Sequence, residues 1–184
     1  MKRIFVAVRV EPEECLQGMI ASLKEGLKNE KINWTNPDNI HITLAFLGET
    51  AEKQVKVIRE RLKEKCEGSG RFDLILKGSG VFKSMNDPRI IWTGIGHNDK
   101  MIRLNELVKA GLAASDVVIE DRPFKPHLTL GRIKHISDRD VLKKLLERYH
   151  DTEIQKVPVN EVIVYESILL QTGPLYKPLD KISL

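Results

Sequence analysis

The 184-residue chain contains few cysteine and aromatic residues. It has two cysteines, and Phe, Trp and Tyr together make up 5% of the residues. Two cysteines are too few for the disulfide framework that stabilises many small secreted proteins. Cys15 and Cys66 each fall on the apolar stripe of a predicted helix, so we expect both to be small buried side chains.

The sequence also lacks long apolar runs and a leader-type segment. No run approaches the roughly 20 apolar residues that a membrane-spanning helix requires. The first ten residues, MKRIFVAVRV, alternate as in a β-strand and contain neither a long apolar core nor a small-residue cleavage site. We therefore expect a cytoplasmic protein with no membrane anchor.

Motifs for nucleoside triphosphates and for metals are missing as well. The sequence has no GxxxxGK[ST] loop and no obvious lysine nucleotidyl-transfer motif, which argues against an ATP-driven reaction. No organised set of Cys or carboxylate ligands lies near the candidate histidines, so a metal centre would need carboxylates that the fold brings in. We expect no metal and no other cofactor.

Charge and length set broad limits. Thirty Lys and Arg residues against 26 Asp and Glu give a net charge of +4, and the pI is near 9.0. This balance mildly favours a polyanionic partner without identifying one. The 41% hydrophobic content is ordinary for a globular protein, and the length suits one large domain or two small lobes.

The most informative pattern is a four-residue motif that occurs twice, as HITL at 41–44 and as HLTL at 127–130. Each copy lies in a predicted β-strand, where side chains alternate between faces, so its histidine and threonine share one face. A pair of histidines supplies a general base and a general acid near neutral pH, and paired hydroxyls donate hydrogen bonds to phosphate oxygens. Two histidines and two hydroxyls on one face therefore indicate metal-free phosphodiester chemistry.

A single His-x-Thr motif in a strand is usually structural, but two matched copies change that interpretation. Burying two imidazoles and two hydroxyls without partners costs free energy, so core packing explains the pair poorly. We therefore predict that His41, Thr43, His127 and Thr129 converge on one active site. His97, His135 and His150 lack the motif and are predicted to lie on the surface.

The motif histidines lie 86 positions apart, and the same offset carries the segment 3–6 (RIFV) onto 89–92 (RIIW). Each copy is predicted to run strand, helix, motif strand, helix, strand. We expect a single domain over 1–184, built from repeat units at about 1–85 and 86–170. The predicted fold class is α+β: bilobal and pseudo-twofold, with antiparallel-rich sheets lining a central cleft.

Apolar residues at helical spacing predict four helices, near 15–27, 55–66, 101–112 and 141–149. The last helix has a predicted capping box at Ser137 and Asp140. Further strands are predicted at 72–77, at 161–168 and in the C-terminal segment.

Cations and aromatic rings near the motifs are candidates for RNA contacts. Arg9, Arg122, Lys125 and Arg132 are candidate phosphate ligands. Strict alternation places Arg132 on the face opposite His127, whereas a bulge at Gly131 would turn it toward the cleft. The rings considered as base-stacking platforms, each with core packing as the stronger interpretation, are Phe5, Trp34, Phe46, Trp92 and Tyr176.

Five stretches resemble the two-histidine phosphoesterases, and within them the LigT-like proteins called 2'-5' RNA ligases or RNA 2',3'-cyclic phosphodiesterases. They are FVAVRV, WTNPDNIHITLAFLGE, PRIIWTGI, RPFKPHLTLGRI and YESILLQTGPLYKPL, and they span nearly the whole chain. The resemblance implies a bilobal α+β fold, a metal-free central cleft, and hydrolysis of RNA 2',3'-cyclic phosphates to 2'-phosphates. The implied partner is RNA with such ends, with tRNA halves as one candidate, and we expect a monomer.

The resemblance also implies roles for the motif residues. It makes His41 the proton donor to the leaving 3'-oxygen and His127 the base that activates water, with Thr43 and Thr129 on the non-bridging phosphate oxygens. A 5'-hydroxyl in place of water would give weak, reversible 2'-5' ligation without ATP. Two alternatives stay open: a non-catalytic RNA-binding protein, and a phosphodiesterase for small cyclic phosphates.

Overall fold

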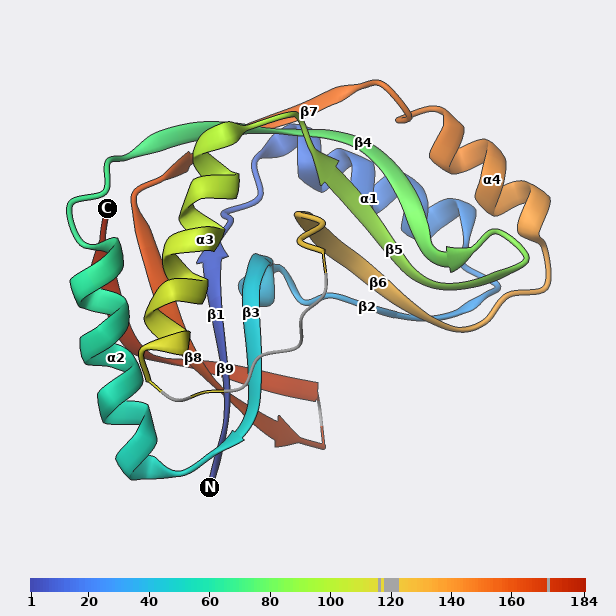
Figure 1. Ribbon diagram of the computed structural model, residues 1–184. Coiled ribbons are helices and arrows are strands. Elements are labelled where there is room, and N and C mark those ends of the chain that lie inside the picture. Colours follow the sequence, from blue (N-terminus) through green and yellow to red (C-terminus); the bar gives the residue numbers. More distant parts are fainter. Residues whose placement is uncertain (116, 118–122, 172) are drawn as a thin grey trace.

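The computed structural model describes residues 1–115, 117, 123–171 and 173–184 (Figure 1). Its helices are α1 (Glu14–Gly26), α2 (Glu52–Cys66), α3 (Asp99–Ala113) and α4 (Arg139–Glu147), with a short 3-10 turn, η1 (Pro37–Asn39). Its strands are β1 (Lys2–Arg9), β2 (Lys31–Trp34), β3 (His41–Thr50), β4 (Phe72–Ser84), β5 (Asp87–Ile95), β6 (His127–His135), β7 (Glu153–Val159), β8 (Glu161–Leu170) and β9 (Gly173–Ser183).

The strands form one antiparallel sheet in the order β7-β4-β5-β6-β3-β1-β8-β9, with β2 paired to β6. The sheet curls so that α2 and α3 cover one half and α1 and α4 cover the other (Figure 1). The two motif strands, β3 and β6, meet in the middle through the pair Ile42 and Leu128. Because these residues are 86 positions apart, their pairing relates the two motifs by a local twofold. The α+β class and the antiparallel sheet are therefore as predicted.

The halves of the sheet exchange strands, which the chain order did not reveal. Strand β8 pairs with β1, whereas β4 pairs with β5, so each half contains strands from both predicted repeat units. The 86-residue offset carries 72–84 onto 158–170, which places β4 and β8 at equivalent positions in opposite halves. The boundaries of the repeat units themselves stay a prediction.

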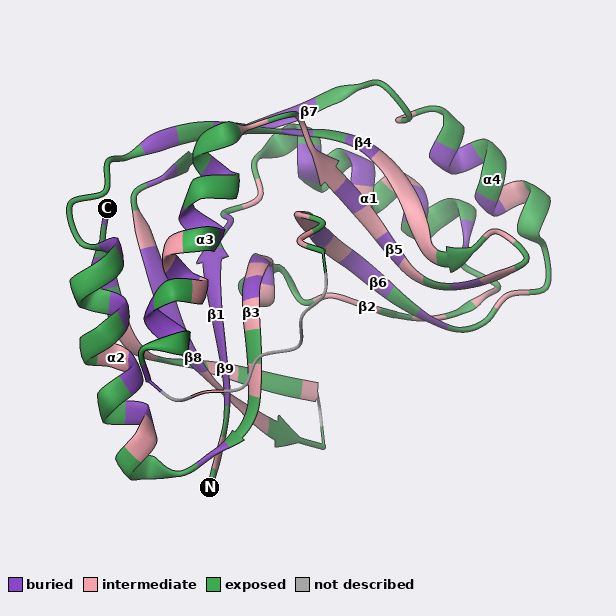
Figure 2. Ribbon diagram, viewed as in Figure 1, coloured by how far each residue is buried: buried purple, intermediate pink, exposed green. Residues whose placement is uncertain are grey.

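Buried apolar residues concentrate where the helices face the sheet (Figure 2). Each helix contributes the side chains that its apolar spacing predicted, including Leu16, Leu62, Leu104 and Leu142, all buried to 2% exposure or less. The strands supply the other wall of this core, with Val6, Ile42, Leu74 and Leu128 fully buried. Burial of this apolar area is the main stabilising contribution to the fold.

Two local predictions are wrong. Cys15 is exposed, because it lies at the start of α1, where the buried stripe begins only at Leu16; Cys66 is buried, and burial raises the pKa of its thiol to about 11. The predicted capping box at Ser137 does not form. Asp138 caps α4 by accepting a hydrogen bond from Val141 N.

Ser137 instead binds the Glu30 carboxylate through both its backbone N–H and its hydroxyl, at 2.7 Å each, and Asp138 N donates to the same group. The carboxylate thus links the loop before β2 to the start of α4. These hydrogen bonds hold the pKa of Glu30 below its usual value, with the Ser137 hydroxyl as the leading cause.

Candidate active site

The paired motifs place their polar residues on one face of the sheet. His41, Thr43, His127 and Thr129 are half-buried, and the intervening apolar residues point into the core. The pairing of Ile42 with Leu128 brings the two copies side by side at the centre of the sheet. The structure therefore brings together the four residues that the repeated motif singled out.

Both imidazoles are held by the same hydrogen bond. His41 Nδ1 lies 2.6 Å from the Asn39 carbonyl oxygen, and His127 Nδ1 lies 2.7 Å from the Lys125 carbonyl oxygen. A carbonyl oxygen only accepts, so each Nδ1 carries the proton that it donates. Each Nε2 is then left to exchange a proton with a substrate. Residues 39 and 125 are themselves 86 positions apart.

The surroundings of the histidines favour their neutral forms. Burial is the leading cause that lowers the pKa of His41, and the positive charges of Arg132 and His127 lower it further. Burial likewise lowers the pKa of His127, again with a contribution from Arg132. The hydrogen bonds to the two carbonyl oxygens oppose these shifts. A neutral imidazole accepts a proton at Nε2, as a general base does, whereas a general acid must already carry a proton at Nε2 when it acts.

A bulge follows each motif threonine. On β3, Thr43 and Ala45 pair with consecutive residues of β1, so Leu44 is the extra residue. On β6, Thr129 and Gly131 pair with consecutive residues of β5, so Leu130 is extra. These bulges bend the motif strands at equivalent positions.

The bulge on β6 settles the orientation of Arg132. Leu130 and Gly131 are adjacent and both buried, so strict alternation is broken and Arg132 is exposed on the His127 side. Its charge acts on His41, on His127 and on Tyr176. Arg132 therefore lies close enough to both motif histidines for its charge to act on them, and its role as a phosphate ligand stays a prediction.

The carbonyl groups freed by the bulges find partners outside the sheet ladder. Asn105, buried on α3, donates its side-chain amide to the Leu44 oxygen at 3.0 Å. Thr35 N donates to the Leu130 oxygen at 2.9 Å, and the Thr35 hydroxyl donates to the Thr129 oxygen at 2.9 Å. Because an unpaired buried carbonyl costs free energy, these contacts fix the backbone that carries the motif threonines.

Aromatic rings surround the two histidines unequally. The ring centroids of Phe5 and Tyr176 lie 5.0 and 5.2 Å from that of His41. His127 has Phe82 edge-on at 4.6 Å. Phe82 was not predicted as a site residue, since it lies beyond the strand predicted at 72–77, whereas β4 continues to Ser84.

The other candidate rings have different environments. Phe46 is 66% exposed, the largest exposure among the aromatic residues considered. Trp92 packs against Phe82, with centroids 5.4 Å apart, and Trp34 packs on the main core. Core packing is therefore the role of Trp34, Trp92 packs on Phe82 beside the His127 ring, and Phe46 lines both hollows of the cleft.

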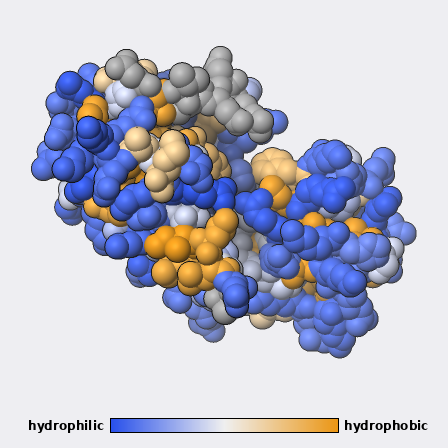
Figure 3. All heavy atoms as spheres, turned by 90° about the horizontal axis from the view of Figure 1, so that it is seen from below, coloured by the Kyte–Doolittle hydropathy of each residue, from blue (hydrophilic) through white to orange (hydrophobic). Residues whose placement is uncertain are grey.

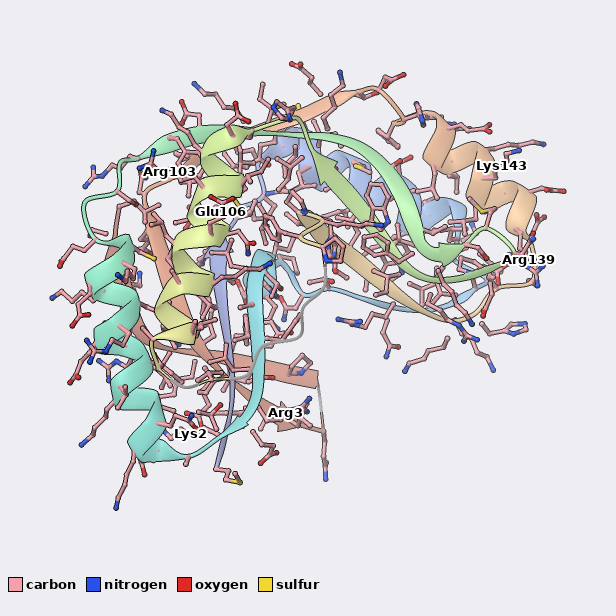
Figure 4. All side chains as sticks on the ribbon, viewed as in Figure 1. Lys2, Arg3, Arg103, Glu106, Arg139 and Lys143 are labelled. Carbon is pink, nitrogen blue, oxygen red and sulfur yellow. The ribbon has the colours of Figure 1, made fainter. Side chains whose placement is uncertain are left out.

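Phe46 lines two hollows, and the second of them is also lined by the motif residues Thr43 and His127. The first, of about 480 Å³, is lined by residues of the His41 side that include Arg3, Phe5, Phe46 and Tyr176. The second, of about 360 Å³, is lined by residues of both motif copies, Thr43 and His127, together with Phe46, Phe82, Lys109, Phe124 and Lys125. Figure 3 shows the molecule hollowed between its two halves, with apolar side chains at the rim, and Figure 4 shows Arg3 beside β1 near the β8–β9 hairpin.

The remaining predicted cations and histidines are scattered. Arg9 is half-exposed and lies 3.9 Å from the Glu11 carboxylate, and Arg122 lies outside the described residues. His97, His135 and His150 are exposed, as predicted.

Among the described residues, no group of three or more His, Cys, Asp or Glu side chains is arranged to hold a metal ion. None of the helices described is long and apolar enough to cross a membrane.

Comparison with known proteins identifies the family. A family model described as LigT like Phosphoesterase matches residues 8–92 and 96–176. The chain belongs to this family. The match includes both motif strands, so the paired histidines of this LigT-like phosphoesterase lie within the family's shared sequence.

Curated relatives agree with this assignment. The RNA 2',3'-cyclic phosphodiesterase of Thermotoga maritima is 33% identical over 177 residues, which cover 96% of this chain and 92% of the relative. The RNA 2',3'-cyclic phosphodiesterase of Aeropyrum pernix is 34% identical over 166 residues, covering 88% and 93%.

Solved structures show the same fold. A crystal structure of a Thermus thermophilus protein superposes on this LigT-like phosphoesterase with a TM-score of 0.80 and 27% identity, covering 99% of this chain and 97% of that one. E. coli LigT complexed with 3'-AMP superposes with a TM-score of 0.78 at 24% identity, covering 100% and 98%.

Proposed function

We propose that this protein hydrolyses RNA 2',3'-cyclic phosphate ends to 2'-phosphates by two-histidine acid and base catalysis that needs no metal. The observation that carries the proposal is the matched hydrogen bonding of His41 and His127, whose Nδ1 atoms both donate to carbonyl oxygens. Two Nε2 atoms on one face supply the acid and the base that a phosphodiester displacement requires. The names of the curated relatives support RNA 2',3'-cyclic phosphates as the substrate.

The reaction divides between the two imidazoles. Nε2 of His127 takes a proton from water as the water oxygen attacks phosphorus, and Nε2 of His41 gives a proton to the departing 3'-oxygen. The attacking and leaving oxygens are in line through phosphorus, so the two histidines act from opposite sides. The 2'-oxygen keeps the phosphate, and the product has a free 3'-hydroxyl.

The neighbouring donors stabilise charge on the phosphoryl oxygens. The hydroxyls of Thr43 and Thr129 lie on the same face as the imidazoles and donate to the non-bridging oxygens. The Arg132 guanidinium, turned into the cleft by the bulge, binds the same oxygens by charge-assisted hydrogen bonds. The hydrogen bonds of Asn105 and Thr35 hold the backbone that carries the two threonines, which lowers the cost of reorganisation.

The same chemistry supports slow, reversible 2'-5' ligation without ATP. A cyclic phosphate is strained, so a 5'-hydroxyl in place of water gives a 2'-5' diester, and the reverse reaction regenerates the cyclic phosphate. Hydrolysis dominates because water is abundant. The partner is RNA with cyclic phosphate ends, with tRNA halves as candidate substrates, and the protein acts as a monomer.

The test is hydrolysis of an oligoribonucleotide with a 2',3'-cyclic phosphate end in excess EDTA, with the product terminus identified. We expect the wild type to form a 2'-phosphate, and the His41→Ala and His127→Ala variants each to lose about 10²–10⁴-fold in rate. Binding of the RNA without turnover by folded wild-type protein would contradict the proposal and favour a binding protein. Turnover of mononucleotide cyclic phosphates alone would favour a small-molecule phosphodiesterase.

A further inference from the structure

The rings beside the two motif histidines occupy positions that the repeat does not relate. The 86-residue offset carries Phe82, beside the second histidine, onto Ile168. It carries Phe5, beside the first histidine, onto Ile91, which is buried in the core. The ring beside each histidine is therefore no part of the repeated motif, and each half of the sheet supports its imidazole in its own way.

The His127 imidazole has two contacts that fix it. Its Nδ1 donates to the Lys125 oxygen at 2.7 Å, which leaves the ring free to tilt about that hydrogen bond. The Phe82 ring lies 4.6 Å away between centroids, at an interplanar angle of 85°, which is the favoured edge-to-face geometry. In the part of the chain that the structure describes, no other aromatic ring pairs with this imidazole. Phe82 therefore limits the tilt that the hydrogen bond leaves open.

The Phe82 ring is held in turn by Trp92, with ring centroids 5.4 Å apart. The indole lies over two glycines. A Cβ added to Gly80 would lie 2.8 Å from Trp92 Cη2, and one added to Gly94 would lie 3.3 Å from Trp92 Cζ3. In the sheet, Gly80 pairs with Trp92, and Gly94 pairs with His127. The missing side chains at these two positions therefore make the surface on which the indole lies.

Packing determines the orientation of this indole. Trp92 Nε1 is buried, and among the described residues it is the one buried side-chain nitrogen or oxygen without a hydrogen-bond partner. A buried indole N–H usually has a partner, and leaving it without one costs free energy. The shape of the glycine surface and the contact with Phe82 therefore hold the ring without the help of a polar contact.

The strands below the indole are fixed by a bulge in β4. Gly78 is the extra residue between the pairs Lys77–Gly94 and Ser79–Thr93, and its φ of 74° suits glycine. The buried Thr93 hydroxyl donates to the Gly78 oxygen at 2.7 Å. This hydrogen bond holds β4 and β5 in the register that places Gly80 opposite the indole.

We propose that Phe82 is a positioning residue for His127. Trp92, seated on Gly80 and Gly94, holds the Phe82 ring, and this ring holds the imidazole so that Nε2 points toward the attacking water. The proposed function makes His127 the base, so this role of Phe82 rests on that function. A base must lie within hydrogen-bond reach of the proton that it takes, and a small displacement lowers the rate of the chemical step without weakening substrate binding.

The first experiment compares two substitutions at position 82 in single-turnover hydrolysis of a cyclic-phosphate oligoribonucleotide. Phe82→Leu removes the ring, and we expect the maximal rate to fall about tenfold with the half-saturating RNA concentration unchanged. Phe82→Tyr keeps the ring and should stay within about twofold of the wild-type rate. A weaker half-saturation with an unchanged maximal rate in Phe82→Leu would overturn the proposal, because Phe82 would then act on RNA binding.

The matched control is Phe72→Leu, which removes a buried ring from the same strand, β4, away from the motif residues. We expect this variant to have a lower free energy of unfolding and an unchanged maximal rate. Equal losses of rate in Phe72→Leu and Phe82→Leu would show a general effect on the fold and would overturn the positioning role.

A double-mutant cycle shows whether Phe82 acts through His127. Phe82→Leu should cause no further loss of rate in a His127→Ala background, because the imidazole that it positions is gone. In a His41→Ala background it should still cause its loss of about tenfold. A further loss of the same size in the His127→Ala background would overturn the proposal.

Gly80→Ala tests the part of Trp92 while it keeps every ring. The added methyl group displaces the indole, so we expect the maximal rate to fall about three- to tenfold. The matched control is Gly96→Ala, whose Cβ would meet its nearest neighbour, the Ile75 oxygen, at 3.7 Å. An unchanged rate in Gly80→Ala would overturn the proposed support. If the wild type hydrolysed no cyclic phosphate, the proposed function would fail; hydrolysis by the wild type with a full rate in Phe82→Leu would overturn the positioning role alone.

Discussion

The two motif histidines share a backbone arrangement and differ in what surrounds them. Each donates Nδ1–H to the carbonyl group two residues earlier, and each strand bulges after its threonine. His41 packs against both Phe5 and Tyr176, whereas His127 contacts Phe82 and borders an open hollow. The repeat therefore gives two equivalent imidazoles in unequal surroundings, and we propose different tasks for them.

The residues that hold the two imidazoles differ as well. The Asn39 side chain donates to the Pro174 oxygen at 2.8 Å, which ties the loop before His41 to β9. Its counterpart, Lys125, is exposed and lines the hollow on the His127 side. The residue that holds His41 is thus itself tied to β9, whereas the residue that holds His127 lines an open hollow.

The largest expected effect is on catalytic rate, and it distinguishes the proposed acid, His41, from the proposed base, His127. A substrate with an aryl leaving group needs no proton from His41, so His41→Ala should recover most of its activity on such an ester, while His127→Ala stays impaired by about 10²–10⁴-fold. Rates on the aryl ester and on the RNA substrate measure this directly. Equal recovery in both variants would show that the assigned tasks are wrong.

Arg132 acts on both histidines, so its removal should change binding and titration together. For Arg132→Ala we expect kcat/KM to fall about 10–100-fold through loss of charge-assisted hydrogen bonds to the phosphate. Because the positive charge lowers the pKa of both histidines, its removal should also shift the pH profile toward higher pH. Arg132→Lys, which keeps the charge, should restore the profile more fully than the rate.

Substitutions at positions 39 and 125 compare the two residues whose carbonyl groups hold His41 and His127. Asn39→Ala removes the bond to Pro174 and loosens the loop that orients His41, so we expect kcat to fall about three- to tenfold with little change in KM. Lys125→Ala leaves the His127 hydrogen bond to the backbone in place, and a smaller change in kcat is expected. A larger effect at 125 than at 39 would contradict the unequal anchoring.

The smallest expected effect is on stability. The pKa values of His41 and His127 lie below their ordinary value near 6.5 in the folded protein, so the unfolded chain binds more protons as the pH falls. The contribution of the two neutral histidines to the free energy of unfolding is fully present above pH 6.5 and declines below that pH. The free energy of unfolding from urea denaturation should drop between about pH 6.5 and 5, and should drop less in His41→Ala. If the free energy of unfolding had the same pH dependence in His41→Ala as in the wild type, His41 would not contribute to it.

Sequence patterns predicted most of the elements because the apolar spacing of all four helices is regular. The motif faces followed from strand alternation, and the threonines and histidines indeed share one face. Strands β2 and β7 were missed, since β2 has four residues and β7 is an edge strand that contains Pro158, so neither has a continuous apolar pattern.

Other features depend on contacts between distant segments. The exchange of β4 and β8 between the halves, the Glu30 link to Ser137 and the packing of Phe82 on His127 have no local signal. The bulge at Leu130, by contrast, was anticipated from Gly131 as an alternative, because glycine in a strand often marks a bulge. Cys15 shows the opposite case, in which a residue at a helix end follows the apolar spacing and is still exposed.

The most direct test of the division between the histidines is the pH dependence of single-turnover hydrolysis by the wild type and the two alanine variants. The account predicts a bell-shaped wild-type profile, loss of the alkaline limb in His41→Ala, and loss of the acidic limb in His127→Ala. Retention of both limbs in either variant, or loss of the same limb in both, would contradict the assignment of His41 as acid and His127 as base.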